Sequence, residues 1–182
     1  MTDAPETYHV VLLVEQALTN VDAAQVRSLH EGLDEPVVYH VLLPLEDAAA
    51  RIESSMGSLA GGEVLASPAM MMHEEDIDAV RRDCEEQSAA ELAATLAALQ
   101  AAGATATGEV VEVPPVDALA ATVTALDARE AIILTRPHVV AEFFHVDWTS
   151  KARRHIGVPI LHLLEHENFD EQAHGGEGIT GL

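Results

Sequence analysis

The sequence has few of the residues that cross-link a chain or anchor it in a membrane. Cys84 is the single cysteine among 182 residues, which excludes an internal disulfide and a cysteine-rich zinc site. A lone thiol fits a reducing compartment, and we expect a cytoplasmic protein. No apolar run approaches the roughly 20 residues that a membrane span needs. The first ten residues, MTDAPETYHV, hold two acids and no cation, unlike a signal peptide.

Cationic residues are also scarce. Nine Lys and Arg face 31 Asp and Glu, giving a formal net charge of −22. A field of that sign repels nucleic acid and anionic membranes, so we expect neither as a partner. Two interpretations stay open: general solubility or adaptation to salt, and an acidic surface for a basic partner. Four of the nine cations gather near the C-terminus, at Arg136, Lys151, Arg153 and Arg154.

The familiar catalytic and metal-binding motifs are absent. None of the ten histidines belongs to an HExxH motif, and His162 and His166 stand four apart across the end of a strand-like run, so they need not share a face. The sequence contains neither a GxSxG elbow nor a P-loop. We therefore predict no metal site and name no catalytic residue.

Apolar runs alternate with helical patterns along residues 8–164. The predicted strands are 8–14 (YHVVLLV), 37–44, 105–113, 130–135 and 158–164. Thr19 and Asp22 have capping-box spacing and open a helix to about Glu31. Further helices are predicted at 74–102, from Pro115 to about Leu126, and at 147–156. Cys84 lies on the apolar stripe of the second helix, so we expect it to be packed rather than reactive.

This alternation predicts one α/β domain, residues 1–164, with a parallel sheet and helices on both faces. The fold class is a five-stranded, mostly parallel, doubly wound, Rossmann-like sheet. The stretch 105–113 mixes Thr, Glu and Val, as an edge strand would. Residues 165–182 are polar and glycine-rich, and we expect a disordered tail.

In such a sheet, ligands bind beyond the carboxyl ends of the strands, where the winding direction reverses. If the first and fourth strands are neighbours, one crevice collects polar side chains from three loops. The candidate ligand-binding residues are Glu15, Gln16, Thr135, Arg136, His138, Thr149 and Ser150. Free amides at the start of the helix 147–156 would favour an anion there. The alternative is that Arg136 pairs with a nearby acid, Glu142 or Asp147.

The element order, together with several sequence stretches, resembles the universal stress protein family. Arg154-His155, Ile156-Gly157-Val158 and Pro159-Ile160-Leu161 match the family's C-terminal ending, and residues 101–113 followed by 116–134 look like its central half. The resemblance implies a strand order of 3-2-1-4-5, a stress-related role and a homodimer. Glu15 stands where the family usually has an aspartate.

The family's glycines are replaced in this chain. Thr135 and His138 stand at the two positions of the G-x-x-G motif, and Val146-Asp147 replaces the later Gly-Ser/Thr pair, while Thr149 keeps a hydroxyl nearby. Glycine there lets the backbone approach a triphosphate. Because the standard ATP motif is absent, the resemblance does not imply ATP binding in the family's usual mode. The cofactor stays open, with ATP or another nucleotide as the candidates.

The sequence favours a non-catalytic binding or regulatory protein that takes a small anionic or nucleotide-like ligand in a non-standard pocket. One alternative is a dimeric interaction module with a vestigial pocket, paired through the apolar edge strand Val158–Leu164. The other is a small hydrolase or nucleotidyl-transfer enzyme on the same scaffold.

Overall fold

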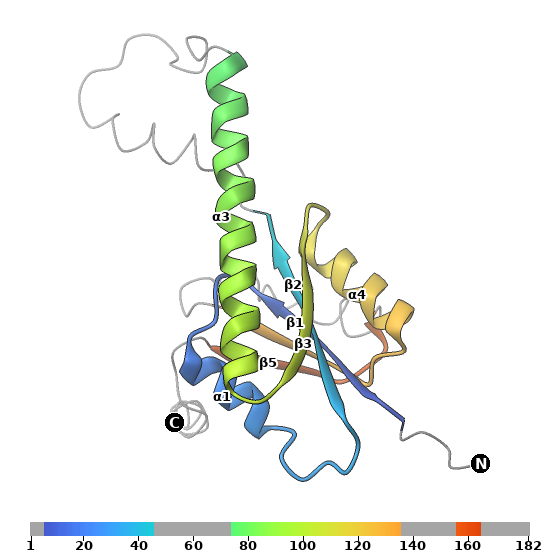
Figure 1. Cartoon of the computed structure of the whole chain (residues 1–182). Coiled ribbons are helices and arrows are strands. Elements are labelled where there is room, and N and C mark those ends of the chain that lie inside the picture. The colour runs from blue at the N-terminus through green and yellow to red at the C-terminus, as the bar shows by residue number, and fades with distance from the viewer. Residues whose placement is uncertain (1–5, 46–73, 136–155, 165–182) are drawn as a thin grey trace, which may run out of the picture.

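The computed structural model describes residues 6–45, 74–135 and 156–164, and every structural statement below concerns these ranges. Their elements, in chain order, are β1 Tyr8–Val14, α1 Asn20–Ser28, β2 Val37–Pro44, α3 Glu74–Ala101, β3 Thr105–Val111, α4 Pro115–Leu126, β4 Glu130–Thr135 and β5 Ile160–Leu164. Figure 1 shows these elements along the chain. The segment 46–73, most of the predicted helix 147–156 and the tail 165–182 lie outside the described ranges.

The five strands form one parallel sheet in the order β3-β2-β1-β4-β5, which confirms the predicted fold class and strand order. Leu12 in the central strand is in register with Val41 of β2 on one side and with Ile132 of β4 on the other. The strands β3 and β5 are the two edges of this sheet. The prediction of an edge strand within residues 105–113 is therefore confirmed.

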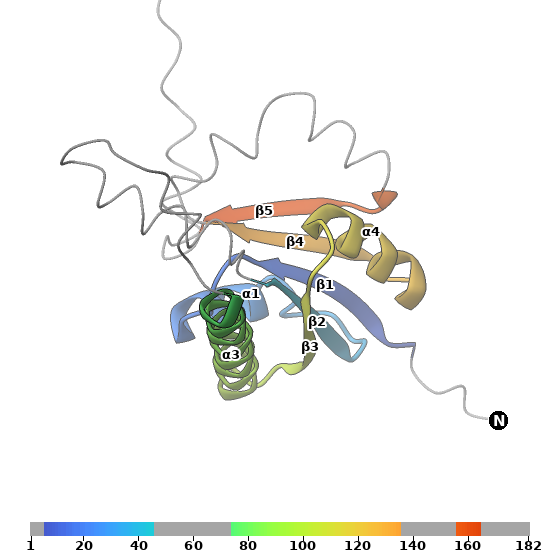
Figure 2. The ribbon, with the colours of Figure 1, turned by 90° about the horizontal axis from the view of Figure 1, so that it is seen from above.

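Helices cover both faces of the sheet, and Figure 2 shows α1 and α3 on one side with α4 on the other. Successive side chains of a strand point to opposite faces, so each strand divides its apolar residues between two cores. Val10, Leu12 and Val14 pack toward α1 and α3. Val11 and Leu13 pack toward α4. Burial on both faces explains why β1 is apolar without alternation.

The predicted capping box is present at the start of α1. The Thr19 hydroxyl accepts the Asp22 backbone N–H at 3.2 Å, and the Asp22 carboxylate accepts the Thr19 backbone N–H at 3.0 Å. These two bonds satisfy N–H groups that a helix start otherwise leaves open. The helix ends at Ser28 rather than near Glu31, with Leu29 as its C-cap. The turn that follows passes through Gly32, whose φ of +104° is a left-handed conformation that glycine adopts readily.

The long helix α3 follows the predicted stripe over its C-terminal part. Cys84 is buried, as expected, and so are Thr95 and Leu99. Ile77, near the start of the helix, is 39% exposed. Figure 1 shows why: the N-terminal part of α3 extends past the end of the sheet. Spacing places a residue on a stripe, but the length of the neighbouring sheet decides whether that stripe is covered.

The two edge strands are shorter than predicted. The strand β3 ends at Val111 rather than Val113, where the Val111 carbonyl accepts the Leu45 N–H at 2.9 Å. The strand β5 begins at Ile160 rather than Val158. Pro159 lacks an N–H and enters the pairing only through its carbonyl, which accepts the Ala131 N–H at 3.0 Å.

Candidate ligand site at the carboxyl ends of β1 and β4

The sheet reverses its winding direction at β1 and β4. These strands are parallel neighbours, with Leu13 in register with Ile133 and Val14 with Leu134. From β1 the chain passes to β2 on one side, whereas β4 and β5 lie on the other side. In a doubly wound sheet, the carboxyl ends of two such strands are where a ligand crevice is expected.

Two hydrogen bonds fix the loop that follows β1. The Glu15 N–H donates to the Leu134 carbonyl at 3.3 Å, which ties the loop to the end of β4. The Leu18 N–H donates to the buried Thr95 hydroxyl of α3 at 3.1 Å. Glu15 and Gln16, the first two residues of this loop, are half-buried. The first wall of the crevice is thus held by the sheet and by a helix.

The described segment that follows β1, residues 15–22, is acidic. Asp22, in the first turn of α1, is buried, and its carboxylate accepts bonds from the backbone N–H and the hydroxyl of Thr19. This carboxylate occupies the positive end of the helix, where an anionic ligand would otherwise be stabilised. Glu15 adds a second acid nearby. An anion bound here needs a cation from the loop after β4.

The structure brings three of the predicted site positions to one end of the sheet. Glu15 and Gln16 follow β1 directly, and Thr135 is the last residue of β4, in register with Leu164. The other four predicted residues lie outside the described ranges: Arg136, His138, Thr149 and Ser150. Their place in the crevice remains a prediction.

A second polar cluster lies at the opposite end of the sheet, and the sequence analysis missed it. The buried His30 ring places Nε2 against a carboxylate oxygen of Glu130 and Nδ1 at 2.8 Å from the Tyr39 hydroxyl. The Tyr8 hydroxyl donates to the second oxygen of Glu130 at 3.3 Å. Burial raises the pKa of Tyr39 to about 12, and burial followed by the Glu130 charge raises the pKa of Tyr8.

This cluster joins the end of α1 to strands β1, β2 and β4, and every polar atom described above has a partner. In the sequence, the one indication of this cluster was Glu130, an acid at the start of an apolar strand. Its histidine partner is a hundred residues away in sequence, so local patterns could not identify it. Within the described ranges, no group of three or more His, Cys, Asp or Glu side chains could hold a metal ion. No helix in those ranges is long and apolar enough to cross a membrane.

The topology and the crevice define a doubly wound α/β protein of the Rossmann-like class. No protein-family profile and no curated protein matches the chain. Solved structures do match it. The hypothetical protein MJ0577 has a TM-score of 0.54 at 9% identity, covering 88% of this chain and 99% of its own.

Two universal stress proteins match at lower TM-scores. The AMP-bound family protein from Arabidopsis thaliana has 13% identity and a TM-score of 0.48, with 90% of this chain and 94% of that one covered. The protein from Archaeoglobus fulgidus in complex with dAMP has 17% identity and a TM-score of 0.46, with 87% and 98% covered. The chain shares its fold with MJ0577, and an identity this low establishes the fold alone.

Proposed function

We propose that this protein is a non-catalytic binding or regulatory protein that takes a nucleotide or another small anion at the carboxyl ends of β1 and β4. The observation that carries the proposal is the adjacency of these two parallel strands at the point where the winding reverses. The bond from the Glu15 N–H to the Leu134 carbonyl holds the two strand exits together.

The proposed ligand contacts combine a described wall with the loop after β4. Glu15, Gln16 and Thr135 stand at the strand ends, and Arg136, His138, Thr149 and Ser150 supply the polar groups predicted from the sequence. Because Glu15 and Asp22 make the described wall acidic, Arg136 is the residue on which anion binding depends. AMP and dAMP, named for two solved proteins of this fold, are suitable probes together with ATP and inorganic phosphate.

Calorimetric titration of these four probes tests the site. We expect a nucleotide to bind and Arg136→Ala to weaken that binding at least about tenfold, as the loss of a charged hydrogen bond does. Arg129→Ala is the matched control, because its guanidinium pairs with Glu6 and Glu35 near the start of β4, away from the crevice. Nucleotide binding that survives Arg136→Ala unchanged rejects the site, and release of phosphate from ATP would reject a non-catalytic role.

The alternative function is a dimeric interaction module with a vestigial pocket. It is favoured by the edge position of β5, where Leu161 is 37% exposed beside the buried Leu163. An unpaired, apolar strand edge invites a further strand, and a second copy of the chain would cover it symmetrically. Absence of binding by all four probes, together with a stable dimer, would favour this alternative.

A further inference from the structure

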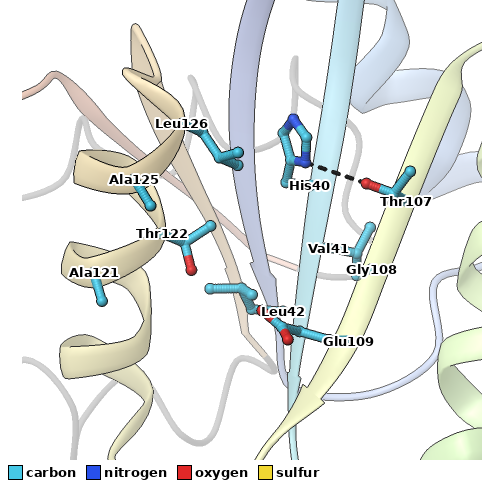
Figure 3. Close-up of a pocket in the computed structure, with 10 residues that line it drawn as sticks. All are labelled: His40, Val41, Leu42, Thr107, Gly108, Glu109, Ala121, Thr122, Ala125 and Leu126. Carbon is cyan, nitrogen blue, oxygen red and sulfur yellow. Dashed lines mark hydrogen bonds between the residues drawn. The ribbon is translucent and has the colours of Figure 1, made fainter.

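A groove of about 420 Å³ lies between α4 and the strands β2 and β3, on the α4 face of the sheet. Figure 3 shows the residues that line it, some on α4 and the others on β2 and β3. Ala125 and Leu126 contribute apolar surface above the buried Leu42, and His40, Thr107 and Glu109 contribute polar groups. The volume is within the range of small-molecule sites. The groove is formed by the middle of the strands, not by the crevice at their carboxyl ends.

The groove exists because α4 covers only part of its face. Leu119 and Val123 are buried in the core that α4 shares with Val11, Leu13 and Ile133 of the central strands. Toward β3, the same helix presents short side chains, Ala121, Thr122 and Ala125. Thr107 and Glu109 on β3 are exposed. Within the described ranges, the outer half of this face is therefore open.

A row of hydrogen-bonded side chains crosses three strands beside the groove. His9 Nδ1 lies 2.9 Å from His40 Nε2, and the Thr107 hydroxyl lies 3.2 Å from His40 Nδ1. Burial, and then the neighbouring His9, lower the pKa of His40. His40 is therefore neutral at pH 7 and offers hydrogen-bonding groups without positive charge.

The charge of the groove has one sign. Glu109 is the single formally charged side chain among the lining residues, and it makes no ion pair with any described residue. Among the residues that the structure describes, no lysine or arginine lines the groove. The chain around it carries a formal net charge of −22. A cation is attracted to such a site and an anion is repelled.

We propose that this groove binds a small organic cation, an ammonium group carried on an aliphatic or aromatic body. The ammonium lies against the Glu109 carboxylate, where the hydroxyl oxygens of Thr107 and Thr122 can accept hydrogen bonds from its other N–H groups. The apolar body packs on Ala125 and Leu126. This ligand is opposite in charge to the nucleotide proposed for the crevice, and the two sites share no residue.

Hexylammonium, hexanol and hexanoate are matched probes for this proposal because they share one apolar body. We expect hexylammonium to shift the backbone amide resonances of 107–109 and 121–126 saturably, hexanol to bind less tightly and hexanoate not to bind. Glu109→Gln should weaken hexylammonium binding about fivefold, as the loss of an exposed ion pair does, and leave hexanol binding unchanged. Glu112→Gln, an exposed acid outside the groove, is the control and should change nothing.

A second variant tests the groove independently of its charge. Ala121 is exposed on α4, so Ala121→Leu should fold normally while filling the groove and weakening both hexylammonium and hexanol. Equal binding of hexylammonium and hexanoate, an unaffected Glu109→Gln protein, or no shifts at these amides overturns the proposal. So does probe binding that weakens as protein concentration rises, because a second copy would then occupy the groove. None of these outcomes bears on nucleotide binding, which depends on Arg136.

Discussion

The hydroxyl of Tyr39 is the most informative single group in the described core. It is fully buried, it lies 2.8 Å from His30 Nδ1, and the Val26 carbonyl is a second, longer partner at 3.4 Å. His30 in turn contacts Glu130, so one hydroxyl completes a network that spans α1, β2 and β4. A buried polar network stabilises a fold only while each member keeps its partner.

Tyr39→Phe should lower the free energy of unfolding by about 1 kcal/mol, because it removes one buried hydrogen bond and leaves His30 with fewer partners. Tyr8→Phe is the comparison, since the Tyr8 hydroxyl bond to Glu130 is longer, at 3.3 Å, and less buried, and its loss should cost less. Urea denaturation at pH 7 measures both variants. Equal stability of Tyr39→Phe and the wild type would contradict a stabilising role for the network.

The pH dependence gives a second readout of the same hydroxyl. The pKa of Tyr39 is about 12 in the folded protein against 10.0 for a free tyrosine, so between these values the unfolded chain binds fewer protons than the folded one. Stability should therefore fall as the pH rises from 10 toward 12. In Tyr39→Phe the fall should be shallower, and an unchanged slope would show that other groups cause it.

At the scale of elements, β1, β2 and β4 have the predicted bounds because each is a dense apolar run ended by a proline or a polar residue. The edge strands β3 and β5 are shorter than predicted, since Pro159 and the turn near Pro114 limit their pairing. Gly108 in β3 also has a structural role that its neighbours in the sequence do not indicate, because a side chain there would not fit. A Cβ at Gly108 would lie 2.8 Å from the Val41 carbonyl oxygen and 2.9 Å from Leu92 Cδ1.

Gly108→Ala should therefore destabilise the protein, by about 1–3 kcal/mol, because a backbone oxygen cannot move aside without shifting β2 against β3. Thr105→Ala, an exposed position on the same strand, is the control and should stay within about 0.5 kcal/mol of the wild type. Thermal or urea unfolding decides between them. A Gly108→Ala protein as stable as the control would mean that β3 is not held as closely as described.

At the scale of the whole molecule, β5 is an edge strand of the sheet, and its apolar sequence is not interrupted by a charged side chain. Burial lowers the pKa of His162, so this histidine adds no positive charge to the strand at pH 7. The edge therefore consists of neutral side chains from Ile160 to Leu163. A neutral, apolar edge in a strongly acidic protein is a suitable place for two copies to meet.

If two copies pair through β5, Leu161→Asp should raise the dimer dissociation constant at least about tenfold, because it places an unpaired carboxylate in the interface. Leu33→Asp, at a position 44% exposed in the loop after α1, is the matched control. Sedimentation velocity at micromolar concentration measures both. A monomeric wild type, or dimers of equal strength in both variants, would place the contact elsewhere or remove it.

The sequence by itself determined the strands and helices of the described ranges to within a few residues, the capping box at Thr19 and the parallel sheet, because these follow from local periodicity and turn chemistry. Only the tertiary structure revealed the network of His30 and Glu130, the close approach at Gly108 and the groove beside α4. Each of these depends on residues far apart in the chain that meet when strands pair and helices dock. Local sequence patterns do not indicate which distant residues come into contact, whereas strand pairing and helix packing determine those contacts.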